Sequence, residues 1–239
     1  MKLIIKQENA VYYLKDNVTK ETIYGGAAGG GKTALGVLFL IEQCQLYPGS
    51  RWLMGRSKLK ALKETTLNTF FEQATLLQIT SQFNYNAQSG VIYWNNGSEI
   101  LLKDLYLYPS DPNFDSLGSL EITGAFIDEC NQITYKAWQV VKSRIRYKIK
   151  QFGITPKMLG TCNPAKNWVY SQFYLKDKNG TLDKDKKFIQ ALPTDNPHLP
   201  QSYLESLLSL DENSRQRLYY GNWEYDNDPA KLIDYEKIQ

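Results

Sequence analysis

One glycine-rich stretch near the amino terminus limits the folds open to this chain more than any other feature. Residues 25–33 read GGAAGGGKT, which places five of the chain's 16 glycines beside one lysine and one threonine. Glycine loses more backbone entropy on folding than any other residue, so such a stretch is costly to order. We therefore expect it to hold a ligand that needs bare main chain and a positive charge.

The neighbours of this stretch indicate what it binds. Residues 22–25 (TIYG) predict a buried strand, and residues 33–46 predict an apolar helix. Between them the sequence fits G-x-x-x-x-G-K-[ST], the P-loop pattern, whose main-chain N–H groups and helix amino terminus bind phosphate. The predicted ATP-binding residues are Gly26, Ala27, Ala28, Gly29, Gly30, Gly31, Lys32 and Thr33. Lys32 is expected to reach the β- and γ-phosphates and to act in catalysis, and Thr33 to give its hydroxyl to Mg²⁺.

Strands alternate with helices along most of the chain. Further strands are expected at 51–55, 121–129 and 157–164, and further helices at 57–77 and from about residue 134. Residues 90–105 predict a hairpin with a type I′ turn at Asn96-Gly97, and residues 176–187 (KDKNGTLDKDKK) predict a charged loop. This order predicts an α/β fold, a mainly parallel central sheet with helices on both faces and an antiparallel hairpin extension.

Two acids follow the predicted strand that ends in AFIDE. Ligands of open α/β sheets bind at the carboxyl ends of the strands, where Asp128 and Glu129 are placed. We expect Asp128 to hold Mg²⁺ and Glu129 to activate the attacking water as a general base. An adjacent glutamate favours hydrolysis over transfer to a second metabolite. Taken alone, the pair could equally be a solvated acidic turn.

A third polar segment, GTCNP at 160–164, ends another predicted strand. Thr161 and Asn163 would then point toward the γ-phosphate, where ATP and its products differ. An Asn-Pro turn without a sensing role is the alternative explanation.

Together these motifs resemble a known family. GGAAGGGKT, AFIDE and GTCNP, with NWVYSQF and QRLYYGNWEY after them, look like the ATPase part of the large terminase subunits of tailed bacteriophages. The likeness runs from about residue 20 to 239. It implies a P-loop NTPase of the ASCE class (RecA- and terminase-like), an ATP- and Mg²⁺-dependent motor that drives double-stranded DNA into a capsid. In that family Thr161 and Asn163 would belong to the motif that couples hydrolysis to DNA movement.

The resemblance also implies an organisation and partners. Residues 1–225 are expected to form the ATPase domain, and residues 226–239 a linker toward a nuclease domain that this chain lacks, so Asp226, Asp228 and Asp234 are assigned no metal. The expected partners are double-stranded DNA, the portal protein and the small terminase subunit, in a homo-oligomeric ring, with a monomer as the alternative in isolation. The expected location is the host cytoplasm, transiently at the procapsid portal, and no membrane association is expected.

The source of an arginine finger is left open by the sequence. Many relatives carry an arginine shortly before the acidic strand, but this segment reads DSLGSLEI. The candidates are Arg56, which follows a predicted strand, and Arg144 and Arg146, which follow the helix after Glu129. Such an arginine stabilises the charge of the transferring phosphate, from the same chain or from a neighbour.

Two basic clusters are candidates for DNA contact, with a solvated charged face as the alternative. Residues 142–150 (KSRIRYKIK) carry charges at alternate positions, which suits a strand, yet Trp138, Val141 and Ile145 follow a helical period. The second cluster is Lys58, Lys60 and Lys63. Adenine could be covered by Tyr12 or Tyr13 and read by Gln7, although ordinary packing explains these residues as well.

Composition excludes several other functions. His198 is the chain's one histidine and the three cysteines lie far apart, which argues against a Cys/His zinc site and a Ser-His-Asp triad. The net charge of +3 permits a polyanionic partner without requiring one. Two rival functions share the core: a helicase-like or repair DNA translocase, for which no second P-loop is seen, and a nucleotide kinase or a protein that uses ATP as a structural ligand.

Overall fold

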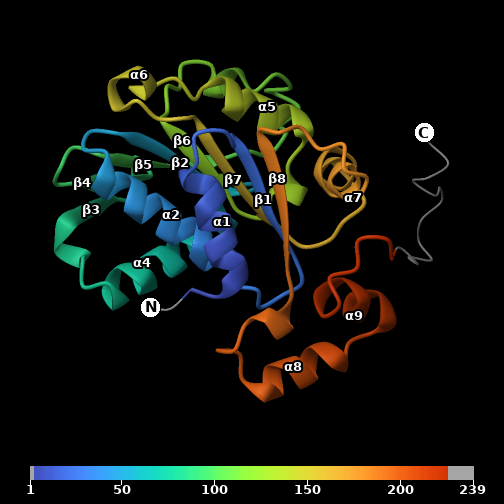
Figure 1. The fold of residues 1–239 in the computed structure, drawn as a ribbon. Helices are drawn as coiled ribbons and strands as arrows, with labels where there is room; N and C mark the ends of the chain where they lie inside the picture. Colours follow the sequence, from blue (N-terminus) through green and yellow to red (C-terminus); the bar gives the residue numbers. More distant parts are fainter. Residues whose placement is uncertain (1–2, 226–239) are drawn as a thin grey trace.

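A single eight-stranded sheet organises the residues that the structure, a computed structural model, describes, namely 3–225 (Figure 1). The strand order is β3-β4-β5-β2-β6-β7-β1-β8, and β2, β5, β6, β7, β1 and β8 are parallel to one another. The strands are β1 (Glu21–Gly26), β2 (Arg51–Arg56), β3 (Phe83–Asn86), β4 (Val91–Trp94), β5 (Glu99–Asp104), β6 (Gly124–Ile127), β7 (Lys157–Cys162) and β8 (Lys186–Ala191). The antiparallel pairs β3–β4 and β4–β5 extend one edge, so the predicted fold class is confirmed.

Helices cover both faces of this sheet. One face carries α1 (Ile5–Lys15), α2 (Lys32–Leu46), α3 (Leu59–Ala61) and α4 (Leu67–Leu76), and the other carries α5 (Tyr135–Ser143) and α7 (Leu175–Lys178). The short α6 (Ile149–Phe152) follows α5, and α8 (Gln201–Leu208) and α9 (Glu212–Leu218) pack together past the carboxyl end of β8 (Figure 1). Within residues 3–225, no helix is both long and apolar enough to cross a membrane.

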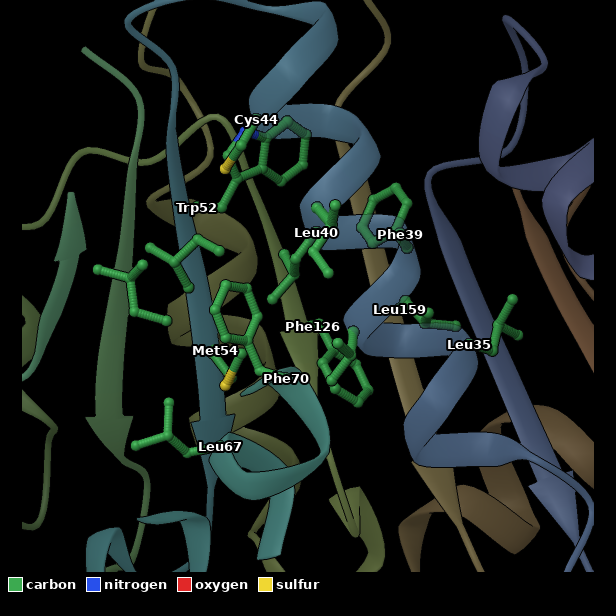
Figure 2. Close-up of a cluster of buried hydrophobic side chains, with 14 of the residues drawn as sticks. Leu35, Phe39, Leu40, Cys44, Trp52, Met54, Leu67, Phe70, Phe126 and Leu159 are labelled. Atoms are coloured by element: carbon green, nitrogen blue, oxygen red, sulfur yellow. The ribbon is translucent and has the colours of Figure 1, made fainter. Parts of the chain in front are cut away.

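The core on the α2 face explains why this helix is apolar on nearly every side. Figure 2 shows its side chains meeting those of the neighbouring strands and of α4, with Leu35, Phe39, Leu40, Trp52, Met54, Leu67, Phe70, Phe126 and Leu159 among them. Phe39 and Trp52 meet edge to face, with ring centroids 5.5 Å apart. Gly36 lets α2 approach the sheet, because a Cβ there would lie 2.1 Å from the ring of Phe126. The amino end of α2 is thereby held against the sheet.

The structure corrects several local predictions. Asn96 does not have the positive φ that a type I′ turn requires; Gly97 N donates to Trp94 O, and Gly97 alone has the left-handed conformation. The helix expected at 57–77 contains a π-helical turn at Leu62–Thr66. Residues 142–150 form neither a continuous strand nor a continuous helix, because α5 ends at Ser143 and α6 begins at Ile149.

The expected charged loop at 176–187 is also only partly right. It begins within α7, and its last two residues already belong to β8, a strand that its lysines concealed. The predicted linker 226–239, with Asp226, Asp228 and Asp234, lies outside the described residues.

Candidate active site

Four neighbouring parallel strands deliver the predicted site residues to one edge of the sheet. β2 ends at Arg56, β6 leads into Asp128 and Glu129, β7 leads into Asn163, and β1 leads into the P-loop. Because the strands are parallel, their carboxyl ends meet at the same edge. β7 lies between β1 and β6, so the GTCNP segment lies beside both the P-loop and the acid pair.

The carbonyl groups of the P-loop are held by side chains from four parts of the chain. Five of its carbonyl oxygens accept such a hydrogen bond. The pairs are Gln7 Nε2 with Gly31 O at 3.0 Å, the Tyr24 hydroxyl with Gly30 O at 3.1 Å, Asn196 Nδ2 with Gly29 O at 2.7 Å, and Lys32 Nζ with Gly26 O at 3.3 Å and with Ala27 O. The loop conformation is therefore fixed by contacts outside the P-loop motif as well as by its own sequence.

Among the described residues, three main-chain N–H groups of the loop, unlike its carbonyl groups, are free of hydrogen bonds. Those of Gly29, Gly30 and Gly31 have no acceptor among residues 3–225, although this is the stretch that opens α2. Gly29 and Gly31 have φ angles of 77° and 68°, a left-handed conformation that favours glycine. Three consecutive donors at a helix amino terminus form the arrangement that binds a phosphate group.

Lys32 lies in this cradle with its ammonium group buried. Burial lowers the pKa of Lys32, and the carboxylates of Glu129 and Asp128 oppose that change. The nearby acids therefore favour the charged ammonium group, the form that binds phosphate.

Asp128 is surrounded by hydroxyl donors. The Thr161 hydroxyl donates to Oδ1 at 2.6 Å, the Thr66 hydroxyl to Oδ2 at 2.7 Å, and the Thr33 hydroxyl lies 3.2 Å from each oxygen. Arg56 Nη1 lies 3.8 Å from Oδ2. The two carboxylate oxygens of Asp128 are thus contacted by three hydroxyl groups, with a guanidinium group nearby. The π-helical turn ends at Thr66, and such turns are frequent at functional sites.

The same residues fit a magnesium ion. Asp128 and Thr33 present adjacent carboxylate and hydroxyl oxygens, and the described residues contain no cluster of three or more histidines, cysteines or acids that could hold a metal. Mg²⁺ is commonly bound through one or two carboxylates together with substrate phosphates and water. The donor set therefore suits an ion that arrives with a nucleotide.

Glu129 has an unusual backbone and an unusual environment. Its φ of 51° is left-handed, a conformation that costs energy in a residue with a side chain and is often found at functional sites. Asn163 Nδ2 lies 3.4 Å from Oε1. Burial and the charge of Asp128 raise the pKa of Glu129, while the cations of Lys32, Arg56 and Arg217 oppose the rise. A carboxylate with a raised pKa is a better proton acceptor, as a general base requires.

Thr161 and Asn163 thus each contact one of the two acids. Thr161 bonds Asp128, and Asn163 bonds Glu129. Asn163 Oδ1 is buried with no hydrogen-bond partner in the part of the chain that the structure describes. The carboxyl end of β7 and the residue that follows it are therefore in direct contact with the predicted metal ligand and the predicted base.

The three candidate arginines are placed very differently. Arg56 lies at the site, with its Nε buried and unpartnered among the described residues. Arg144 donates to Gly118 O at 2.9 Å, and Arg146 pairs with Glu121 at 3.1 Å.

Both contacts lie beside the amino end of β6, whereas the P-loop and the acid pair lie at the carboxyl ends of the parallel strands. Ile122 N donates to Arg144 O, and residue 122 is about 20 Å along the strand from residue 128. In this structure Arg144 and Arg146 therefore lie far from the P-loop of their own chain. A role toward a neighbouring copy remains a prediction.

Sequence reasoning missed several residues of this site. Asn196 lies far along the chain in a segment without a motif, and Thr66 follows no pattern that separates it from other helical threonines. Arg217 lies within QRLYYGNWEY, but nothing in that segment assigned a role to this arginine. Gln7 was considered for the adenine edge. In the structure its amide instead bridges Gly31 O and the N–H of Ile4.

The residues considered for adenine and DNA contact are also placed. Tyr12 is exposed on α1, and the ring of Tyr13 lies 5.1 Å from Lys187 Nζ. Lys58 Nζ lies 3.0 Å from the centre of the Tyr106 ring. These contacts leave the adenine and DNA assignments as predictions.

Comparison with known proteins identifies the family and supports the fold. The family described as phage terminase large subunit matches residues 19–222. The large terminase from a thermophilic bacteriophage superposes with a TM-score of 0.71 at 13% identity, over 93% of this chain and 54% of that one. The same protein in complex with ATP-gamma-S gives 0.68 at 15% identity, over 93% and 53%.

A third structure matches over most of its own length. The ATPase domain of the large terminase of Thermus phage P74-26 gives a TM-score of 0.61 at 14% identity, over 88% of this chain and 91% of that one. No match is found among curated protein sequences. The chain spans about half the length of the thermophilic bacteriophage terminase.

Proposed function

The chain belongs to the phage terminase large subunit family, and on that premise we propose that it is a Mg²⁺-dependent ATPase whose hydrolysis drives double-stranded DNA into a viral capsid. The observation that carries the nucleotide part is the P-loop itself. Its carbonyl groups are tied back by side chains, while three N–H donors at the head of α2 have no acceptor among the described residues.

Each residue at the carboxyl ends of these parallel strands has a separate role in the proposed reaction. The N–H groups of Gly29–Gly31 and the ammonium group of Lys32 bind the β- and γ-phosphates, so Lys32 leaves its carbonyl partners for phosphate oxygens. Asp128 and Thr33 would hold the Mg²⁺, which supplies charge neutralisation at the phosphates.

Glu129 accepts a proton from the attacking water, and Asn163 keeps that carboxylate oriented. The water oxygen bonds to the γ-phosphorus, the bond to the bridging oxygen breaks, and ADP leaves as the other product. Arg56, beside Asp128, is the arginine of the same chain best placed to offset the developing charge.

In this proposal the coupling to DNA movement rests on the carboxyl end of β7 and the residues directly after it. Loss of the γ-phosphate changes the charge that Asp128 and Glu129 face, and Thr161 and Asn163 contact these two acids directly. We propose that this segment passes the change to a DNA-gripping surface, in a ring of copies with the portal protein and the small terminase subunit, in the host cytoplasm.

Phosphate release tests the proposal. The chain is mixed with ATP and Mg²⁺, with and without double-stranded DNA, over a range of protein concentrations, and inorganic phosphate is measured. Release without any acceptor is the expected result. A rate per chain that rises with concentration would show that a neighbouring copy contributes to the site, whereas a constant rate per chain is expected if Arg56 of the same chain is sufficient. Absence of release under every condition, or binding of ATP without turnover, would leave only a structural use of the nucleotide.

Mixing variants locates the finger. Arg56→Ala, Arg144→Ala and Arg146→Ala are each mixed with Glu129→Gln. A finger that acts on a neighbour restores activity in mixed rings, at sites where an intact Glu129 lies beside a chain with an intact arginine, whereas a finger that acts within its own chain restores none.

A further inference from the structure

The helix α9 brings an arginine to the edge of the active site. Arg217 Nε donates to Pro164 O at 3.0 Å. Pro164 directly follows Asn163, the residue that contacts Glu129. The next residue of α9, Leu218, accepts a hydrogen bond through its carbonyl from Ala28 N of the P-loop at 2.8 Å.

Two adjacent residues of α9 therefore connect the two halves of the site. Arg217 is bonded to the segment after β7, about 50 residues earlier in the sequence, and Leu218 is bonded to the P-loop, which lies farther away still. A guanidinium donor is suited to this task, because its planar group holds fixed donor directions and its charge is permanent. The Pro164 carbonyl has no other hydrogen-bond donor among residues 3–225.

We propose that Arg217 is a positioning residue for ATP hydrolysis: by holding the Pro164 carbonyl, it keeps Asn163 in contact with Glu129 and so keeps the base aligned with the attacking water. The inference rests on the proposed function, since it concerns the same reaction. It assigns Arg217 no contact with ATP, so ATP affinity and turnover should respond differently to its loss.

Contacts other than those of Arg217 anchor this region. The chain after α9 is anchored by Gln190 Nε2, which donates to Gly221 O at 2.8 Å, and by the buried Trp223, whose ring stacks on Tyr174 with centroids 5.3 Å apart. Asp211 caps the amino end of α9 through the N–H of Ser214. Truncation of Arg217 should therefore leave the segment folded.

A matched control lies two residues earlier on the same helix. Arg215 pairs with Glu212 and lies 3.4 Å from Leu208 O, and it makes no contact with the segment after β7 or with the P-loop. Arg215→Ala thus removes the same charge and side-chain volume from α9 without disturbing the site.

The experiment compares Arg217→Ala, Arg217→Lys and Arg215→Ala in steady-state phosphate release, binding of a fluorescent ATP analogue, and thermal unfolding. For Arg217→Ala we expect kcat to fall about 10- to 100-fold, because small misplacements of a catalytic group cost rates of this size, with analogue affinity changed less than about threefold. Lysine can still donate to a carbonyl, so Arg217→Lys should recover part of the loss. Arg215→Ala should match wild type.

A double-mutant cycle with Glu129→Gln tests whether Arg217 affects turnover through Glu129. If Arg217 acts by aligning Glu129, Arg217→Ala should change the residual rate of Glu129→Gln by less than about twofold. An undiminished effect in that background would overturn the inference, as would wild-type turnover of Arg217→Ala. If Arg217→Ala lowers kcat and also lowers the unfolding temperature and weakens binding of the ATP analogue, its role is merely structural. By contrast, full turnover by Glu129→Gln itself would refute the base in the proposed function.

Discussion

Replacement of Glu129 by glutamine tests the chemistry of the site most directly. Glutamine has the shape of glutamate, and its Oε1 still accepts the hydrogen bond from Asn163 Nδ2, which is 3.4 Å long in the wild type. The substitution therefore removes the proton-accepting carboxylate while leaving the packing in place. The groups expected to bind the phosphates, Lys32 and the N–H donors of Gly29–Gly31, are untouched.

The expected loss of turnover follows from the role of a general base. A positioned base contributes about 10²- to 10⁴-fold to the rate, which corresponds to about 3–5 kcal/mol of transition-state stabilisation. ATP affinity should stay within about threefold of wild type or increase, because an anion beside the triphosphate has been removed. The variant should bind ATP and release almost no phosphate.

The assay pairs phosphate release with binding of a fluorescent ATP analogue. Glu121→Gln is the matched control, since Glu121 is half-exposed and pairs with Arg146 at the opposite edge of the sheet. The control should turn over at the wild-type rate. Turnover of Glu129→Gln within about threefold of wild type would refute the reasoning, because a loss of basicity could not then be limiting.

Three further predictions concern binding and stability. Lys32→Ala should weaken ATP binding, and unchanged affinity for the fluorescent analogue would contradict the P-loop assignment. Gly36→Ala should lower the free energy of unfolding in urea by about 1–3 kcal/mol, because the new Cβ would lie 2.1 Å from the Phe126 ring; an unchanged midpoint would show that the ring moves freely. Partial burial raises the pKa of Asp16, but hydrogen bonds from Thr19 and Lys157 lower it by more, from 3.8 to about 2. The ionised Asp16 therefore stabilises the fold fully above about pH 3.8, and this stabilisation disappears as the pH falls toward about 2. The stability difference between wild type and Asp16→Asn, measured by urea unfolding at several pH values, should therefore shrink across that window, and a constant difference would contradict the ion pair.

The parts of the site that the sequence predicted are those encoded within a few consecutive residues. The P-loop, the acid pair and the GTCNP segment each lie at the carboxyl end of a strand, and this position brings all three to the same end of the parallel strands. The fold class was predictable for the same reason, since periodicity of apolar residues is a local property. β8 was missed because the lysines at its start hide the pattern of its last residues.

The order of strands and the packing of distant segments could not be predicted in this way. Arg144 and Arg146 were candidates for catalysis because they follow Glu129 in sequence, yet α5, which lies between Glu129 and these arginines, returns the chain to the opposite edge. Arg217 reaches the site from α9, and although it lies within QRLYYGNWEY, no local pattern there indicates its contact with Pro164.

The sequence by itself determined the chemical groups: a flexible main chain for phosphate, two carboxylates and an amide at strand ends. Only the tertiary structure decided which side chains hold them in place, namely Gln7, Asn196 and Arg217 around the P-loop and the acids. The physical reason is that local hydrogen bonding and apolar periodicity depend on near neighbours, whereas these contacts form only after the sheet has brought segments far apart in sequence within hydrogen-bond distance.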